Sequence, residues 1–281
     1  MGLRINTNVS SLNAQRNLSG TRLNQQRTLE QLSSGQRINR AGDDAAGLAI
    51  SENLKAQIRG LGQAERNAQD GISLVQIAEG GLSEVSNIMI RLRELAVQSA
   101  SDTIGATERK FLNVEFKQLT AEVDRIANST EFNRVPLLNG TGAVFDIQIG
   151  TRNDPLADRL TFDASSADTN IAALGLNLAS VADKISSQNS LSAIDQAITS
   201  VSSIRADFGA LQNRLQSTIN NQQISIENLS AANSRVRDAD IAKTTAELTK
   251  NNILMQAGTS VLAQANQSST SALQLIQQAA G

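Results

Sequence analysis

The sequence lacks several residue types on which enzyme sites and compact cores usually depend. Its 281 residues include no Cys, His, Trp or Tyr, only six Phe and only two Pro. Without Cys or His there is no thiol nucleophile, imidazole base, disulfide bond or ordinary zinc or haem site. Because aromatic side chains normally supply much of the buried area of an enzyme core, this composition favours long, thin helical packing instead. We therefore predict a protein that is not an enzyme, with no catalytic residue, no metal site and no cofactor.

Charge and hydropathy exclude two further classes of partner. The net charge of −2 leaves no basic surface for nucleic acid. No apolar run approaches the roughly 20 residues of a membrane span. The first residues, 1–6, lack the apolar segment of a cleavable signal peptide. We expect no nucleic-acid partner, no membrane span, and a chain that either stays in the cytosol or is exported without a signal peptide.

The first forty residues carry an eleven-residue repeat. Gln-Arg-Asn-Leu at 15–18 recurs as Gln-Arg-Thr-Leu at 26–29. This period, about 3.67 residues per turn, favours a nearly straight coil. A single amphipathic surface helix is the alternative, but its apolar stripe is too thin to be buried by itself. The predicted assembly seam of this segment consists of Leu12, Leu18, Leu23 and Leu29.

A seven-residue repeat begins near Leu54 and predicts a helix of about 46 residues, roughly 70 Å long. Asp43 and Asp44 precede it and are good N-cap candidates. They could also be interpreted as a paired-carboxylate site, but no His accompanies them and Ala-Ala follows, so capping is the favoured interpretation. The repeat contains Leu54, Leu61, Ala68, Val75, Leu82, Met89 and Ala96.

A second seven-residue repeat begins near Ile194 and matches the first in length. Ser192 and Asp195 form a plausible capping box at its start, after an Ala/Ser/Asn-rich connection over 165–190. Two helices of equal length separated by a reversing segment pack antiparallel most simply. The repeat contains Ile194, Val201, Phe208, Leu215, Gln222, Leu229 and Val236.

The middle and the end of the chain complete the pattern. A shorter helix is expected over 112–126, and alternating residues at 144–149 and 159–162 predict two short strands among turn signals such as Val135-Pro136. The predicted fold is therefore mainly α, a long antiparallel helical rod or coiled coil from both chain ends with a small β-hairpin region in the middle. The last forty residues keep the sevenfold pattern, and their predicted assembly seam consists of Leu248, Met255, Leu262 and Ile276.

Several long motifs resemble those of one known family, the bacterial flagellins. The longest is Leu-Ser-Ser-Gly-Gln-Arg-Ile-Asn-Arg-Ala-Gly-Asp-Asp-Ala-Ala-Gly-Leu-Ala-Ile-Ser at 32–51. Others are Arg-Glu-Leu-Ala-Val-Gln at 93–98, Ser-Arg-Val-Arg-Asp-Ala-Asp-Ile-Ala at 234–242 and Ile-Leu-Met-Gln-Ala-Gly at 253–258. The resemblance covers roughly residues 1–165 and 190–281. It indicates a short flagellin that lacks the large variable outer domains.

The resemblance implies a domain plan and a function. Residues 1–42 with 240–281 would form a terminal coiled-coil (inner tube) domain, 43–136 with 190–239 a helical rod domain, and 137–189 a β-hairpin segment with a connecting loop. The chain would be a structural subunit of the flagellar filament, secreted to the extracellular bacterial flagellum and self-polymerised for swimming motility.

The partners that the resemblance implies are many copies of the chain itself, a flagellar export chaperone, the filament cap and hook-associated junction proteins. A hook–filament junction protein is the first alternative function, and an intracellular coiled-coil tether is a second. Unbroken similarity over 32–51 and 234–258 favours flagellin.

The resemblance also implies a contact with the host Toll-like receptor that senses flagellin. The matching positions are Arg91, Leu95 and Glu115. Arg91 and Leu95 are four residues apart and hence neighbours on one helix face. An exposed face with a surface ion pair that also contacts neighbouring subunits is the compatible, simpler interpretation.

Overall fold

The computed structural model describes residues 7–279, and their side chains up to residue 267. The helices are α1 (Val9–Ser34), α2 (Ala45–Ser99), α3 (Ala106–Ser129), a short 3-10 turn η1 (Ala164–Ser166), α4 (Lys184–Arg237) and α5 (Ile241–Ala279). The strands are β1 (Glu131–Phe132), β2 (Val135–Pro136), β3 (Val144–Gln148) and β4 (Arg159–Asp163). The mainly helical fold with a small β region is confirmed. None of the helices among the described residues combines the length and apolar character that a bilayer span requires.

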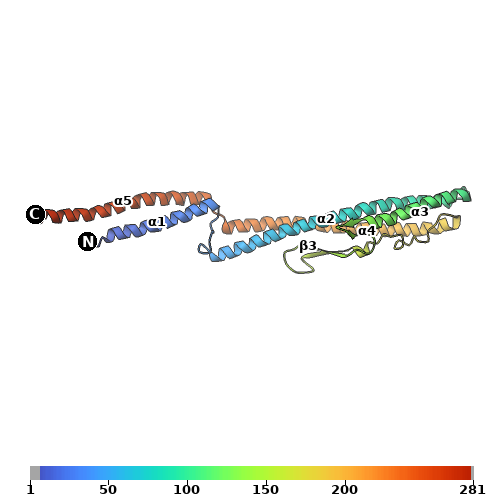
Figure 1. Ribbon diagram of the computed structural model, residues 1–281, viewed down its shortest axis with the longest axis horizontal. Coiled ribbons are helices and arrows are strands. Elements are labelled where there is room, and N and C mark those ends of the chain that lie inside the picture. Colours follow the sequence, from blue (N-terminus) through green and yellow to red (C-terminus); the bar gives the residue numbers. More distant parts are fainter. Residues whose placement is uncertain (1–6, 280–281) are drawn as a thin grey trace. The chain divides into compact units, whose positions relative to one another are not determined.

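Contacts divide the chain into two compact units (Figure 1). Residues 1–56 with 229–281 form the terminal unit, and residues 57–228 form the central unit. Segments from both ends of the chain therefore belong to one unit. These limits lie further from the termini than the expected boundaries at 42 and 240. The expected inner-tube and rod domains stay predictions.

In the terminal unit, α1 and α5 run antiparallel, side by side in Figure 1. Polar groups join them along their length: Ser11 donates to Asn266 at 2.9 Å, and Gln25 donates to Asn252 at 2.6 Å. Between these bonds Leu18 lies over Gly258, where an added Cβ would come 3.1 Å from its Cγ. The interface between these two helices is thus built largely from small and polar side chains, which bury little apolar surface.

The start of α2 is capped as the sequence predicted. The Asp44 carboxylate accepts a 2.8 Å bond from the Gly47 amide, which satisfies one of the free N–H groups of the first turn. The Asp43 carboxylate accepts from the amides of Asn39 and Arg40 instead. Both acidic residues are therefore occupied in shaping the turn that precedes α2.

The core of the central unit lies between α2, α3 and α4. Ion pairs and hydrogen bonds show that α2 and α4 run antiparallel: Arg93 bonds Asp195 at 2.7 Å, and Arg205 bonds Glu79 at 2.6 Å. The repeat positions from 68 to 96 and from 194 to 222 are buried, whereas Leu54, Leu61, Leu229 and Val236 are only half-buried. On α3, Phe116 and Val123 are fully buried, as the expected helix face requires.

Helix α4 begins earlier than the sequence analysis expected. It starts at Lys184, and the Asp183 carboxylate accepts from the Ser186 amide at 3.0 Å. The predicted capping box at Ser192 and Asp195 is wrong, because Ser192 lies inside the helix and bonds Asn189, while Asp195 pairs with Arg93. The first turns bury serines rather than apolar residues at the core-facing positions, which hid them from the hydrophobic pattern.

Two antiparallel hairpins form the β region. In the first, Phe132 pairs with Val135, and Asn133 and Arg134 have φ values of 49° and 64°. This left-handed pair is the geometry of a type I′ turn, so the turn lies at 133–134 rather than at the predicted Val135-Pro136. In the second, β3 pairs with β4 from Val144↔Asp163 to Gln148↔Arg159, which confirms the two predicted strands.

Glycines of α2 let the β region approach the helix closely. A Cβ on Gly71 would lie 2.7 Å from Ile147 of β3, and one on Gly81 would lie 2.7 Å from Thr130 and 2.9 Å from Leu138. Among the described residues, by contrast, nothing lies within 4 Å of a Cβ on Gly80. Gly71 and Gly81 therefore accommodate the β region against α2.

We expect Gly81→Val to destabilise the central unit by about 1–3 kcal/mol, because its side chain overfills the contact with the buried Leu138. Gly80→Val, one position away, is the matched control and should change stability by less than about 0.5 kcal/mol. Thermal unfolding followed by circular dichroism compares the two. Equal effects of the two substitutions would contradict the close approach at Gly81.

The connection between β4 and α4 is a strap fixed on the core. Thr169 donates from both its amide and its hydroxyl to the Leu138 carbonyl, and Asp124 accepts from the Ile171 amide at 2.8 Å. The Val181 carbonyl accepts from the buried Ser99 hydroxyl at 2.7 Å. Four of its apolar side chains complete the core, while Leu178 is exposed; the four are Ile171, Leu174, Leu176 and Val181.

Candidate functional site

The structure leaves three of the four predicted seam residues of α1 exposed. Leu18 is half-buried against α5, but Leu12, Leu23 and Leu29 are 57%, 64% and 46% exposed. The α5-facing positions of α1 are occupied by residues such as the buried Ser11 and Thr28. Three of the four leucines are therefore free to contact something other than α5.

The predicted seam residues of α5 lie on its face toward α1. Leu248, Met255 and Leu262 are half-buried, three or four residues from the positions that contact α1 directly, such as Gly258. Ile276 lies outside the residues whose side chains the structure describes. Within the described part, the α5 seam therefore packs against α1 of the same subunit.

A second set of apolar side chains in the terminal unit remains uncovered. We call these the outer apolar residues; each is between 46% and 64% exposed. They are Val9, Leu12, Leu23, Leu29, Ile50, Ile241, Ile253, Leu254 and Val261. The predicted seams did not include Val9 or the five residues after Leu29, although Ile253 and Val261 stand two helical turns apart, which is a weak helical signal. So many exposed Leu, Ile and Val side chains in one unit are typical of a surface that binds another protein.

Of the predicted receptor face, the structure brings Arg91 and Glu115 together. The Arg91 guanidinium donates to Glu115 at 2.8 and 3.0 Å and to Glu94 at 2.9 Å. The hydrogen bond to Glu115 is the main reason that the pKa of Arg91 is raised above its ordinary value. Both side chains are about half exposed, so this pair lies on the surface.

Leu95 does not share that exposed face. Its side chain is 0% exposed and belongs to the core between α2, α3 and α4. Four residues advance a helix by slightly more than one turn, and here that offset carries Leu95 across the boundary between the outer and the core-facing side of α2. The prediction that Leu95 presents its side chain beside Arg91 is therefore not met in this structure.

Surface carboxylates of the central unit are stabilised in their charged form. A hydrogen bond from Lys184 lowers the pKa of Asp102, and the amide of the residue at N3 of α4 lowers the pKa of Asp183. Hydrogen bonds likewise lower the pKa of Glu122 and that of Asp163. Groups with depressed native pKa values stabilise the fold above their ordinary pKa, and that contribution is lost as the pH falls through the depressed values.

We expect the thermal unfolding midpoint to stay level near neutral pH and to fall below about pH 4, where these carboxylates take up protons. Lys184→Gln should lessen this acid sensitivity, because the pKa of Asp102 then returns toward its ordinary value. Lys110→Gln is the control, since Lys110 is exposed and pairs with no described carboxylate. A midpoint that is unchanged down to strongly acidic pH would contradict the assignment.

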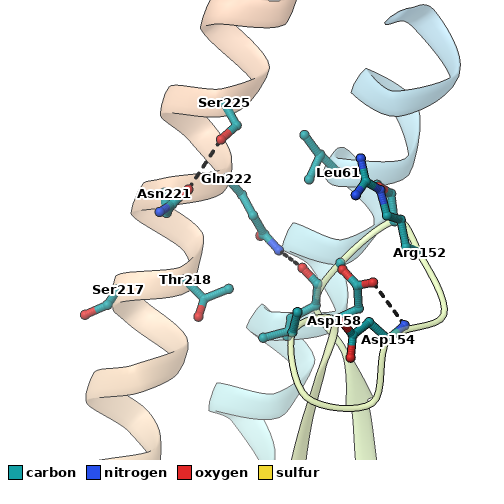
Figure 2. A pocket seen from close by; sticks show the side chains of 13 residues that line it. Leu61, Arg152, Asp154, Asp158, Ser217, Thr218, Asn221, Gln222 and Ser225 are labelled. Atoms are coloured by element: carbon teal, nitrogen blue, oxygen red, sulfur yellow. Dashed lines mark hydrogen bonds between the residues drawn. The ribbon is translucent and has the colours of Figure 1, made fainter. Parts of the chain in front are cut away.

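A polar pocket of about 610 Å³ lies between the β3–β4 loop and α4 (Figure 2). Gln222, at a repeat position otherwise filled by apolar residues, reaches from α4 and donates to the Ile149 carbonyl at 2.5 Å. The carboxylates of Asp154 and Asp158 accept hydrogen bonds from backbone amides within the loop. Gln222 thus holds the loop against α4, while the two carboxylates shape the loop itself. Among the described residues, no group of three His, Cys, Asp or Glu could hold a metal ion.

Comparison with known proteins identifies the family. Residues 5–143 match the model of the bacterial flagellin N-terminal helical region, and residues 191–276 match that of the C-terminal helical region. The chain is 48% identical to a flagellin of Halalkalibacterium halodurans over 273 residues, 97% of this chain and 99% of that protein. It is 46% identical to a Bacillus subtilis flagellin, over 98% and 100% of the two chains. This chain belongs to the bacterial flagellin family.

Further similar proteins include a filament core protein and two solved structures of flagellar proteins. It is 44% identical to the flagellar filament 33 kDa core protein of Treponema phagedenis, over 97% of this chain and 99% of that one. The crystal structure of Bacillus cereus flagellin is similar with a TM-score of 0.51 at 34% identity, over 56% of this chain and 88% of that one. A putative hook-associated protein of Vibrio parahaemolyticus shares the fold, with a TM-score of 0.58 at 16% identity, over 70% and 100%.

These findings favour a filament subunit over the junction protein that was the alternative. The protein is a structural subunit of the bacterial flagellar filament, a member of a structural protein family. Because the relatives of about 280 residues match over nearly their whole length, the short form without large outer domains is confirmed.

Proposed function

We propose that copies of this chain polymerise by burying the outer apolar residues of the terminal unit between neighbouring subunits. The observation that carries the proposal is the exposure of Leu12 and Leu23 on α1 and of Ile253 and Val261 on α5. An isolated subunit leaves these side chains in water. Burying them against a neighbour would stabilise the assembly by about 25 cal/mol for each Å² of apolar surface covered. A homopolymer supplies that cover to every copy except those at its ends.

We extend the proposal to the site of assembly. The subunit is secreted, leaves the cell unfolded through the flagellar export channel and adds to an extracellular filament beneath a cap. The relation to flagellins supports this route. Residues 1–42 with 240–281 would form the inner tube, and 43–136 with 190–239 the surrounding rod. An export chaperone, the cap and hook-associated junction proteins are the further partners.

Polymerisation of the purified chain tests the proposal directly. Seeded with short filament fragments, the protein should form filaments that sediment and are visible by electron microscopy. The surface of these filaments should be smooth, because only the short strap connects β4 to α4 where a folded outer domain would need at least about 50 residues. A protein that stays monomeric under all such conditions would overturn the proposal.

The receptor contact remains a proposal that rests on the exposed Arg91–Glu115 pair. Replacing both with Ala should weaken binding of the monomer to the receptor ectodomain by about tenfold or more, because Arg is a frequent hot spot at interface centres. Arg125, which pairs with Glu122 elsewhere on α3, offers the control pair for double substitution. Surface plasmon resonance measures both. Unchanged affinity in the Arg91/Glu115 variant would refute the contact. Leu95 is best left unchanged, since its loss would disturb the core.

A further inference from the structure

Two breaks between helices face each other inside the terminal unit. The first, residues 35–44, separates α1 from α2, and the second, residues 238–240, separates α4 from α5. They fall in the two motif segments 32–51 and 234–242 on which the family resemblance rests. Neither the assembly surface nor the receptor face uses them. What they do is therefore a separate question.

Backbone hydrogen bonds tie the two breaks together. The Arg37 amide donates to the Arg237 carbonyl at 2.7 Å, and the Ala239 amide donates to the Gly35 carbonyl at 2.9 Å. Gln36 and Asp238 thereby form an isolated antiparallel bridge. Gly35 has a φ of 69°, a left-handed conformation that ends α1 and turns its last carbonyl toward the other break.

Arg237 holds the centre of this junction. Its guanidinium donates to the Gln36 side chain at 2.9 Å and to the Glu52 carboxylate, so one side chain joins the end of α4 to the first break and to α2. Its side chain is only 14% exposed, whereas that of Glu52 is 52% exposed, so loss of Arg237 would remove these bonds and leave the partly buried Gln36 side chain without this donor. In return, the Arg37 guanidinium donates to the Val236 carbonyl at 2.6 Å and so satisfies the C-terminal end of α4.

Each break also forms hydrogen bonds with a terminal helix, the first with α1 and the second with α5. On the first, the Arg40 guanidinium binds the Glu30 carboxylate of α1 through two bonds of 2.7 and 2.9 Å. On the second, Asp240 caps α5 by accepting from the Lys243 amide at 3.1 Å. A displacement of either break is therefore passed on to α1 or to α5.

We propose that residues 35–40 and 236–239 form one coupled joint, in which the two breaks open and close together. Helices α1 and α5 then change direction only together. Neither helix can bend at its own break without losing hydrogen bonds to the other break. This is a conformational device of the subunit, and it holds whether or not the outer apolar residues drive polymerisation. Two independent hinges that happen to touch are the alternative.

Hydrogen exchange on the full-length monomer separates the two possibilities, because amides at each break form hydrogen bonds that do not involve the other break. In the first break the Asn39 and Arg40 amides donate to Asp43. At the second break, Asp240 accepts a hydrogen bond from the Lys243 amide in the first turn of α5. For a coupled joint, Arg237→Ala should speed exchange of the Asn39 and Arg40 amides by about tenfold, and Gln36→Ala should speed that of Lys243 similarly.

Arg235→Ala is the matched control. Arg235 lies in the same last turn of α4, is exposed, and makes no side-chain hydrogen bond with the described residues. It should leave all these amides unchanged. If Arg237→Ala also speeds exchange throughout α2 and α4, that variant is destabilised as a whole. The Gln36→Ala variant then decides the outcome. The proposal is overturned if only the directly bonded Arg37 and Ala239 amides respond, or if Arg235→Ala has the same effect.

Discussion

Replacing Leu12 and Leu23 with Asp should abolish polymerisation while the monomer keeps its fold. Both side chains are more than half exposed in the subunit, so the substitution removes little packing within it. In the filament each buried Leu contributes about 1.5–3 kcal/mol, so the critical concentration should rise by at least about 100-fold. Burial of two unpaired carboxylates adds a further penalty. Sedimentation measures the critical concentration, and circular dichroism checks the monomer.

A second variant adds the same charges one residue away. Asn13→Asp with Asn24→Asp changes exposed polar positions beside the two leucines. Filaments of this variant should form at nearly the wild-type concentration, since no apolar surface is lost. If both double variants fail equally, added charge rather than apolar burial controls assembly, and the outer apolar residues lose their assigned role.

Phe208→Ala should destabilise the central unit by about 3–5 kcal/mol, a large share of the 5–15 kcal/mol that stabilises a typical domain. Phe208 is 1% exposed, and its ring lies 4.8 Å from that of Phe162 on β4. The substitution therefore leaves a cavity where the helices and the second hairpin meet. Thermal unfolding by circular dichroism should show a midpoint lowered by roughly 6–20 °C.

Phe111→Ala provides the same chemical change at a surface position. Its side chain is 70% exposed, so the expected change in stability is within about 0.5 kcal/mol. A Phe208 variant as stable as the Phe111 variant would show that the core of the central unit does not depend on this contact.

Much of the fold could be predicted because the repeats carry a direct physical signal. Positions seven residues apart return to nearly the same helix face, so the ladders from Ala68 to Ala96 and from Ile194 to Leu215 identified the buried sides of α2 and α4. The signal fails where burial is polar. Ser187 and Ser190 are buried in the first turns of α4, and no hydrophobic pattern reveals them.

The candidate surfaces were harder to predict, because periodicity identifies a stripe but not its partner. Leu18 and Leu29 stand eleven residues apart and so on nearly the same side of α1, yet Leu18 is half-buried while Leu29 is 46% exposed. Polar residues such as Ser11 and Thr28 occupy buried positions of α1, while three of its four seam leucines are exposed. Similarly, helical adjacency could not show that Leu95 is in the core while Arg91 is at the surface.

The joint between the helix breaks could not have been foreseen from spacing. Gln36 and Asp238 are 202 positions apart in the sequence, and their pairing depends on the antiparallel course of two long helices. Sequence analysis identified both motifs as family resemblances but gave them no shared role. In the structure, backbone hydrogen bonds and the side chains of Arg37 and Arg237 connect them.

A reconstruction of the polymerised protein by electron cryomicroscopy tests the central claim most directly, because it shows which side chains each subunit buries against its neighbours. We predict that Leu12, Leu23, Ile253 and Val261, all about 60% exposed in the subunit, lie in contacts between copies. Filaments in which these four side chains remain in solvent, with the copies held together through other surfaces, would contradict the account.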